Sequence, residues 1–242
     1  MSISSLSGQV AVITGATSGI GRGVAENLHE AGMLLVLTGR RQDRLTELAE
    51  RLKTNCVTVA GDIADPALPQ RLIDTAVERF GKCDVAFNGA GIMHAGPVPD
   101  VDIEKMCEMI RVNVEAAVRL TYVAAKHFVK AGSGHLINVS SILGTKVRPN
   151  AGVYAGTKYA IEALSEALRM ELAKTNIKIS VIEPGVVNTE LQNHFPVHPR
   201  EALGITQALE PSDIARCVRF LLEQPAHVRI PIMMVLPGEQ PM

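Results

Sequence analysis

The sequence predicts a single α/β domain with one mostly parallel, doubly wound sheet of seven strands and helices on both faces. Three observations predict it. Short apolar runs rich in Val and Ile alternate with longer segments of helical periodicity along the whole chain. The chain has 242 residues, 47% of them hydrophobic, which is enough for one large core. No linker, low-complexity tract or repeat divides it, so we expect residues 1–242 to form one domain.

The expected strands are short and apolar on both faces, as in a buried parallel sheet. In chain order they are QVAVIT (9–14), MLLVLT (33–38), CVTVA (56–60), CDVAFN (83–88), GHLINVS (134–140), IKISVIEP (177–184) and IPIMMVL (230–236). The helical patterns between them include Ile20–Ala31, Asp43–Lys53, Ala67–Phe80, Ile103–Lys130 and Gly152–Leu172. The polar, proline-broken stretch 188–207 follows the sixth strand. We expect it to form a lid, because loops at the carboxyl ends of parallel strands build the ligand site.

Composition excludes several classes of protein. The net charge is -1 and the pI is about 6.7, so no global field favours nucleic acid or an anionic membrane. We find no transmembrane or signal-peptide pattern and expect a cytoplasmic protein. The four cysteines form no CxxC pair. His194 and His198 have the i,i+4 spacing of metal ligands, but Pro196 lies between them. We therefore expect loop histidines and no metal.

A glycine-rich stretch, TGATSGIG (14–21), follows the first expected strand and leads directly into a helix. Its glycines allow a tight turn and a close approach of the backbone to a pyrophosphate, and the helix N-terminus offers free N–H groups. A turn that needs glycine for geometry alone is the simpler interpretation. The position on the first βαβ unit favours a dinucleotide site. The candidate contacts are Gly15, Thr17, Ser18, Gly19, Ile20 and Gly21.

The end of the second expected strand indicates which dinucleotide binds. Chains that prefer NAD usually carry an acidic residue there, which bonds the ribose 2′-hydroxyl. This chain has Gly39 at that place, followed by Arg40 and Arg41. A guanidinium group suits a 2′-phosphate, so we predict NADP(H). The alternative is that the two arginines only begin a solvated helix.

Several motifs, in this order and spacing, resemble the short-chain dehydrogenases/reductases, a family of single-domain oxidoreductases with a Rossmann fold. The resemblance covers nearly the whole chain. It rests on TGATSGIG (14–21), GDI (61–63), NGAG (88–91), Asn113, INVSS (137–141), YAGTK (154–158) and PGVVNT (184–189).

The resemblance implies catalytic roles for Asn113, Ser141, Tyr154 and Lys158. A ketone that receives a hydride must also receive a proton, and Tyr154 is the expected acid in reduction and base in oxidation. Lys158, at i+4 on the same helix face, is expected to lower the phenol pKa and to bond the nicotinamide ribose. Ser141 is expected to hold the substrate oxygen, and Asn113 a water that links Lys158 to solvent.

Each of these residues also has a purely structural interpretation. Tyr154 could be an amphipathic core tyrosine, as we expect for Tyr122 and Tyr159. Ser141 could be a strand-end turn residue, and Asn113 a polar residue that bends its helix. All of them match one mechanism together, which favours the catalytic interpretation.

The resemblance also implies further cofactor contacts. Asp62 is expected at the adenine amino group, unless it only caps the following helix. Asn88 is expected near the adenosine ribose and Thr189 near the nicotinamide carboxamide. The remaining expected contacts are Ile63, Ala90, Gly91, Tyr154, Lys158, Pro184, Gly185 and Val187.

Two departures from the family pattern stand out. Gly89 replaces the second amide of the usual Asn-Asn-Ala-Gly, which puts a hydrogen bond across the central sheet in question. The C-terminus, PAHVRIPIMMVLPGEQPM, lacks the usual glycine-rich turn before the last strand. That ending, with LTGRRQDRL and VIEPG, is most similar to the NADP-dependent 3-hydroxy acid dehydrogenases and the related aldehyde and ketone reductases.

The substrate is the least determined part of the prediction. Met93, His94, Val186 and the lid are expected to form its wall, together with Ser141, Ile142, Leu143 and Tyr154. Arg148 and His94 could pair with a substrate carboxylate, although Arg148 could also face solvent. A small 3-hydroxy acid and a larger apolar ketone both fit, and a non-catalytic cofactor sensor of the same fold is the alternative from another class. The resemblance implies a homodimer or homotetramer.

Overall fold

The computed structural model describes residues 5–241, and its centre is one seven-stranded sheet in the order β3-β2-β1-β4-β5-β6-β7. Every pairing between these strands is parallel, so the expected mostly parallel sheet is parallel throughout the described part of the chain. The strands are β1 (Val10–Thr14), β2 (Leu34–Gly39), β3 (Cys56–Ala60), β4 (Val85–Asn88), β5 (Ser133–Val139), β6 (Asn176–Pro184) and β7 (Ile232–Val235).

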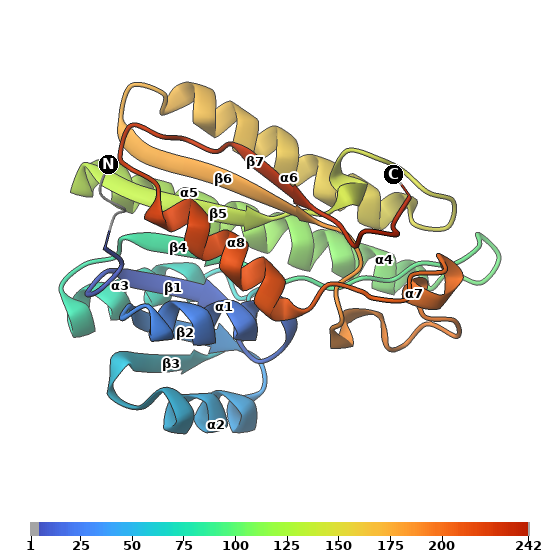
Figure 1. Cartoon of the computed structure of the whole chain (residues 1–242), viewed down its shortest axis with the longest axis horizontal. Coiled ribbons are helices and arrows are strands. Elements are labelled where there is room, and N and C mark those ends of the chain that lie inside the picture. Colours follow the sequence, from blue (N-terminus) through green and yellow to red (C-terminus); the bar gives the residue numbers. More distant parts are fainter. Residues whose placement is uncertain (1–4, 242) are drawn as a thin grey trace.

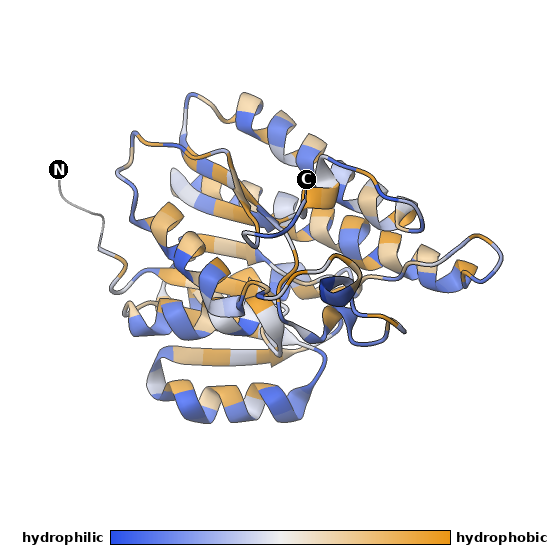
Figure 2. Ribbon diagram, turned by 45° about the vertical axis from the view of Figure 1, so that its right-hand side comes forward, coloured by the Kyte–Doolittle hydropathy of each residue, from blue (hydrophilic) through white to orange (hydrophobic). Residues whose placement is uncertain are grey.

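Helices cover both faces of the sheet, as Figure 1 shows. One face carries α1 (Gly19–Glu30), α2 (Gln42–Leu52) and α8 (Pro211–Glu223). The other carries α3 (Leu68–Phe80), α5 (Ala116–Ala131) and α6 (Gly152–Glu171). In Figure 2 the strands are mainly hydrophobic while the helices are striped, hydrophilic on the side away from the sheet. This pattern follows from burial of both faces of a parallel sheet.

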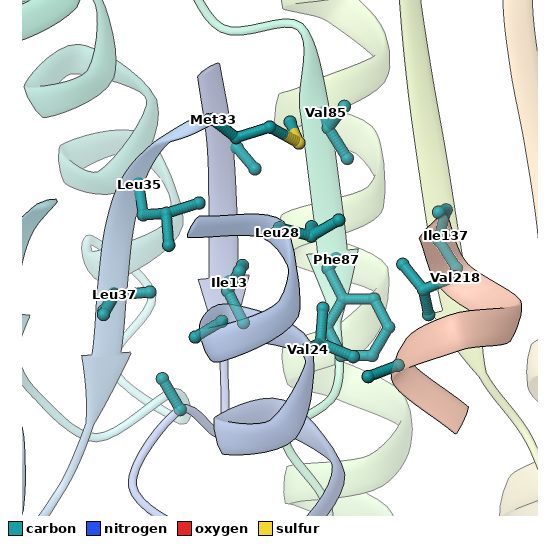
Figure 3. Close-up of a cluster of buried hydrophobic side chains, with 14 of the residues drawn as sticks. Ile13, Val24, Leu28, Met33, Leu35, Leu37, Val85, Phe87, Ile137 and Val218 are labelled. Carbon is teal, nitrogen blue, oxygen red and sulfur yellow. The ribbon is translucent and has the colours of Figure 1, made fainter. Parts of the chain in front are cut away.

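The larger hydrophobic cluster lies between the sheet and the first helix layer. Figure 3 shows Ile13, Leu37 and Phe87 from three neighbouring strands meeting Val24 of α1 and Val218 of α8. These five side chains are fully buried. Alternation of side chains along each strand sends the neighbouring residues to the second cluster, on the opposite face.

The strand order places a ligand crevice between β1 and β4. Strands β2 and β3 follow one another on one side of β1. Strands β4 to β7 follow one another on its other side, so the strand order changes direction between β1 and β4. Loops that leave the carboxyl ends of adjacent strands diverge at such a point and leave a crevice. The glycine loop leaves β1 there, and the NGAG segment leaves β4.

The long helix expected over Ile103–Lys130 is not continuous. The structure has α4 (Ile103–Ile110), a π turn over Arg111–Glu115 and then α5. A π turn admits one extra residue into the helical path and is frequently found at functional sites. Asn113 lies in the middle of it.

The lid is folded rather than open loop. It contains a short 3-10 turn, Glu190–Gln192, and the one-turn helix α7 (Pro199–Ala202), and it returns to the sheet through a bridge between Val187 and Leu209. Within residues 5–241, no helix has the length and apolar character needed to cross a membrane.

Candidate active site

One cleft of about 810 Å³ opens at the carboxyl ends of the strands and collects most of the predicted site residues. The predicted cofactor contacts that line it are Gly15, Thr17, Ser18, Gly19, Ile20, Gly21, Arg40, Arg41, Asp62, Ile63, Ala90, Gly91, Pro184, Gly185, Val187 and Thr189. The predicted catalytic and substrate residues that line it are Met93, His94, Ser141, Ile142, Leu143, Arg148, Tyr154, Lys158 and Val186. Two predicted residues, Asn88 and Asn113, do not line it; their side chains lie behind the wall.

The glycine loop has no room for larger residues. Gly15 has a φ of +70°, and a Cβ on it would lie 2.9 Å from the Gly89 oxygen. A Cβ on Gly21 would lie 2.4 Å from the Gly15 carbonyl oxygen. The loop is therefore packed backbone against backbone at the start of α1, with the helix N–H groups facing the cleft. These features fit the pyrophosphate of a dinucleotide cofactor.

The side chain of Arg41 crosses the cleft mouth to the lid. Its Nη1 lies 2.7 Å from Oε2 of Glu190, and Arg44 Nη1 lies 2.7 Å from Oε1 of the same carboxylate. Arg41 also donates to Thr17 Oγ1 at 3.2 Å. Hydrogen bonds from Arg41 and Arg44 hold the pKa of Glu190 below its ordinary value. Arg41, which we expected to bind a 2′-phosphate, is thus paired with the carboxylate of Glu190. The sequence did not indicate this pair, because the two residues lie 149 positions apart.

Tyr154, Lys158 and Ser141 converge on one wall of the cleft, because α6 carries the first two and the end of β5 leads into the third. Lys158 Nζ lies 5.7 Å from the centroid of the Tyr154 ring and donates to the Val139 carbonyl at 3.0 Å. Ser141 Oγ accepts from Leu143 N at 3.1 Å. All three side chains are buried.

Burial dominates the ionisation of this group. It raises the pKa of Tyr154 to about 12, partly offset by a hydrogen bond with the Ser141 hydroxyl. It lowers the pKa of Lys158 to about 8, with the charge of Glu162 opposing the change. The lowering of the phenol pKa by Lys158 stays a prediction. Both groups lose hydration when buried, and each then favours its neutral form.

Asn113 acts as a clamp on the loop that follows β4. Its Oδ1 accepts from Ile92 N at 2.9 Å, and its Nδ2 donates to Ile92 O at 2.8 Å and to Thr157 Oγ1 at 3.3 Å. A Cβ on Gly91 would lie 3.4 Å from Asn113 Oδ1 and 3.8 Å from Lys158 Nζ, so Gly91 keeps open the space between the two side chains. The water relay stays a prediction.

Asn88 lies beneath the cleft, and its predicted place near a ribose stays a prediction. It is 5% exposed, and its Nδ2 donates to Asn138 Oδ1 at 3.3 Å and to Ala117 O at 3.4 Å. Asn138 in turn donates to Ser165 Oγ on α6 at 2.9 Å. This amide network joins β4, β5 and α6, so it fixes the helix that carries Tyr154.

Thr14 ties the backbone at Gly89 to the first strand. Its hydroxyl accepts from Gly89 N at 3.1 Å and from Ala90 N at 3.2 Å, across the β1–β4 boundary. A Cβ on Gly89 would lie 2.4 Å from Phe87 Cε1, so the packing of β4 requires glycine here. Thr14 opens the TGATSGIG motif but was not among the predicted contacts; its place as the last residue of the first strand is a further sequence signal for it.

Two further positions refine the cofactor wall. Asp62 lines the cleft, and its Oδ1 accepts from Ala64 N at 3.0 Å, so it closes a local turn and caps no helix. Gln240 was not predicted. Its Oε1 accepts from Val186 N at 2.7 Å and fills the space where a Cβ on Gly185 would lie, 2.3 Å away.

The substrate end of the cleft is apolar with a histidine pair at its rim. Met93, Leu143 and Tyr154 belong to one buried cluster, against which Leu191 and Phe195 of the lid pack.

The predicted histidines and Arg148 lie around this part of the cleft or in the lid. The His94 and His194 rings lie 5.2 Å apart, and His198 caps α7 through Nδ1. Arg148 Nη2 donates to Pro241 O at 3.1 Å. Across residues 5–241, no group of three or more potential metal ligands gathers.

The other two tyrosines differ from expectation. Tyr122 and Tyr159 are 44% and 43% exposed, so they are surface residues and not part of the core. Each lies on the outward face of a helix, where an aromatic ring is tolerated singly.

Comparisons with known proteins agree with this site. The family model for short chain dehydrogenases matches residues 9–198. An uncharacterised oxidoreductase of Staphylococcus aureus (strain USA300) is 36% identical over 233 residues, which cover 96% of this chain and 98% of that protein. A relative from Staphylococcus epidermidis (strain ATCC 35984), also an uncharacterised oxidoreductase, is 34% identical over 222 residues and covers 92% and 94%.

Solved structures extend the likeness to proteins with bound cofactor. The closed form of serine dehydrogenase complexed with NADP+ has a TM-score of 0.91 and 28% identity, and covers 97% of each chain. The 3-ketoacyl-(acyl-carrier-protein) reductase of Brucella melitensis, complexed with NADH, has a TM-score of 0.88 and 29% identity, with 97% and 99% covered. With its parallel sheet, its glycine-lined cleft and a family match over most of its length, the chain belongs to the short-chain dehydrogenase family of oxidoreductases.

Proposed function

We propose that the protein is an NADP(H)-dependent oxidoreductase that interconverts a secondary alcohol and a ketone, or a primary alcohol and an aldehyde. The observation that carries this proposal is the convergence of Tyr154, Lys158 and Ser141 on the cleft wall opposite the glycine loop. These three side chains can donate a proton, hold a charge and orient an oxygen at one place.

In reduction, Tyr154 gives its proton to the substrate oxygen as negative charge develops there. Ser141 holds that oxygen through its hydroxyl, and Lys158 stabilises the phenolate left behind. A nicotinamide cofactor, held by the glycine loop and by Lys158, would supply the hydride for this reduction. In oxidation, Tyr154 must start as the phenolate. Because burial raises the pKa of Tyr154 to about 12, oxidation requires nearby positive charge, from Lys158 and from the cofactor when bound, to stabilise the phenolate.

Cofactor choice depends on Arg40 and Arg41. Both line the cleft at the end of β2, and Gly39 leaves no carboxylate on that strand to repel a 2′-phosphate. Arg40→Ala should weaken NADPH binding by roughly tenfold or more, because charge-assisted hydrogen bonds contribute about 1.5–3 kcal/mol. NADH binding should change little. Equal losses for the two cofactors, measured by fluorescence titration, would sink the 2′-phosphate assignment.

The substrate class is tested with paired compounds. Serine dehydrogenase is among the structural relatives, which supports trying serine and 3-hydroxybutyrate. The Met93, Leu143 and Leu191 lining supports trying apolar secondary alcohols. NADP+ reduction followed by absorbance across both sets separates the two. Turnover of the acids alone would direct mutagenesis to His94 and Arg148, whereas turnover of the apolar alcohols alone would reject the 3-hydroxy acid branch.

A non-catalytic cofactor sensor is the competing function. Tyr154→Phe distinguishes the two, because an enzyme should lose turnover while its cofactor affinity survives. A cytoplasmic location and a homodimeric or homotetrameric state remain predictions; light scattering on purified protein would measure the second.

A further inference from the structure

A pair of glutamates lies directly behind the catalytic lysine. Glu162 follows Lys158 by one helical turn on α6, so it extends the face that already carries Tyr154. Glu183 lies on β6, just before the Pro184-Gly185 wall of the cofactor cleft, and is only 1% exposed. The two carboxyl groups lie within hydrogen-bonding reach of each other. None of the predicted site roles uses either residue.

The pair has no adequate donor. Among residues 5–241, no N–H or O–H donates to either oxygen of Glu183 or to Oε1 of Glu162. The Ser140 hydroxyl lies on the same side of Gly144 as Glu162, because a Cβ on Gly144 would lie 2.3 Å from Ser140 Oγ and 3.1 Å from Glu162 Oε1. Two ionised carboxylates in this position would repel each other, and the groups that favour the charge, Ser140, Arg169 and Lys158, act on Glu162. One proton between them turns the repulsion into an O–H···O hydrogen bond.

Charged and polar groups from three elements face the pair. Lys158 and Arg169 lie on α6 with Glu162, Glu183 itself lies on β6, and the neutral Ser140 hydroxyl lies just after β5. Burial raises the pKa of Glu183 to about 7, and the neighbouring Glu162 charge adds to this. Burial also raises the pKa of Glu162, while Ser140, Arg169 and Lys158 oppose the change. Glu183 is the more deeply buried of the two carboxyl groups, so we assign the proton to it and the charge to Glu162, one turn from the lysine.

We propose that Glu162 and Glu183 share one proton near neutral pH, and that the remaining negative charge is the buried counter-ion of Lys158. The pair is then a positioning element for Tyr154 and Lys158, and this last part rests on the proposed function. It explains how a lysine that is 7% exposed, with a backbone carbonyl as its hydrogen-bond acceptor, stays protonated.

The shared proton is tested without any substrate. At pH 6 exposed carboxyl groups are ionised, so infrared spectra of the wild type should show the carbonyl band of a protonated acid, and E183Q should lack it. Glu166→Gln is the matched control, because it makes the same change at an exposed glutamate one turn further along α6. Loss of the band in E166Q, or its absence from the wild type, would overturn the proposal.

Thermal unfolding gives a second measure of the same proton. A carboxyl whose pKa is raised on folding contributes stability below its unfolded pKa, 4.5 here, and loses it as pH rises through about 7. Between pH 5 and pH 8.5 the Tm of the wild type and of E166Q should fall by roughly 5 °C more than that of E183Q. Parallel Tm curves for all three proteins would contradict the shared proton.

The link to the lysine has its own readout. The ¹³Cε resonance of Lys158, assigned by its loss in Lys158→Met, reports the lysine titration in the cofactor-free protein. In E162Q the midpoint should move down by roughly one pH unit, as expected for loss of a nearby opposite charge. It should not move in E166Q. Unchanged midpoints in E162Q would refute the counter-ion role even with the infrared band present.

The catalytic part is decided last. The alkaline limb of the kcat/KM profile should move down with the lysine midpoint in E162Q, and a limb that stays in place would refute the positioning role. If the wild type turns over none of the substrate pairs, the proposed function fails. The infrared, unfolding and resonance measurements still decide the acid pair.

Discussion

Replacing Tyr154 by Phe measures how strongly the fold holds the phenol in its neutral form. Burial raises the pKa of Tyr154 from 10.0 to about 12. A raised acid pKa contributes stability below the unfolded value and loses it as the pH rises from about 10 towards 12. At pH 11, ionisation of this phenol stabilises the unfolded chain by a factor of about eleven and the folded chain by a factor of about 1.1. The free energy of unfolding therefore falls by about 1.4 kcal/mol.

The assay is urea unfolding of the wild type and of Tyr154→Phe at pH 9 and pH 11. Other groups that titrate in this range are common to both proteins and cancel in the difference. The wild type should lose about 1.4 kcal/mol more than the variant between the two pH values. The same substitution should reduce turnover about 10²–10⁴-fold, the usual contribution of a general acid. Unfolding free energies that fall in parallel would show that Tyr154 is not desolvated as the structure requires, and the argument for cofactor-assisted ionisation would fail.

Three further substitutions test the cleft. Glu190→Gln removes the carboxylate that pairs with Arg41 and Arg44. NADPH should then bind about two- to fivefold more tightly, the size expected for exposed ion pairs, while NADH binding stays unchanged. Weaker NADPH binding in a titration would contradict this. Gly21→Ala places a Cβ 2.4 Å from a backbone oxygen and should reduce cofactor affinity at least about tenfold by opening the phosphate loop. At Gly156 no described heavy atom lies within 4 Å of the added Cβ. Gly156→Ala should therefore stabilise α6 by about 0.5–1 kcal/mol in urea unfolding. Equal changes in cofactor affinity and unfolding free energy for the two alanine variants would refute the steric argument.

The order of elements was accessible from sequence because local patterns encode it. Each predicted strand run overlaps an observed strand, and the fold class is confirmed. The break of the predicted helix 103–130 at Asn113 was not accessible. A π turn has no distinctive local pattern; it forms because Asn113 bonds Ile92 in the loop after β4, which is a tertiary contact.

Site residues divide in the same way. The positions of Tyr154 and Lys158 on one helix face follow from their i+4 spacing, and the glycine loop follows from its place after the first strand. The side-chain amide of Asn88, predicted to lie near a ribose, is bonded to Asn138 and Ala117, which no local pattern indicates. Strand pairing decides that outcome, because Asn88 and Asn138 lie opposite each other in adjacent strands.

Sequence alone determined the family and the residue types that carry the chemistry, because periodicity and motif spacing are local properties of the chain. Only the tertiary structure decided how those groups ionise and which side chains support them. Glu190 meets Arg41, Gln240 fills the space beside Gly185, and Glu183 meets Glu162 through packing between distant segments. The burial that raises the pKa of Tyr154 likewise arises only when the helices and the lid cover the ends of the strands.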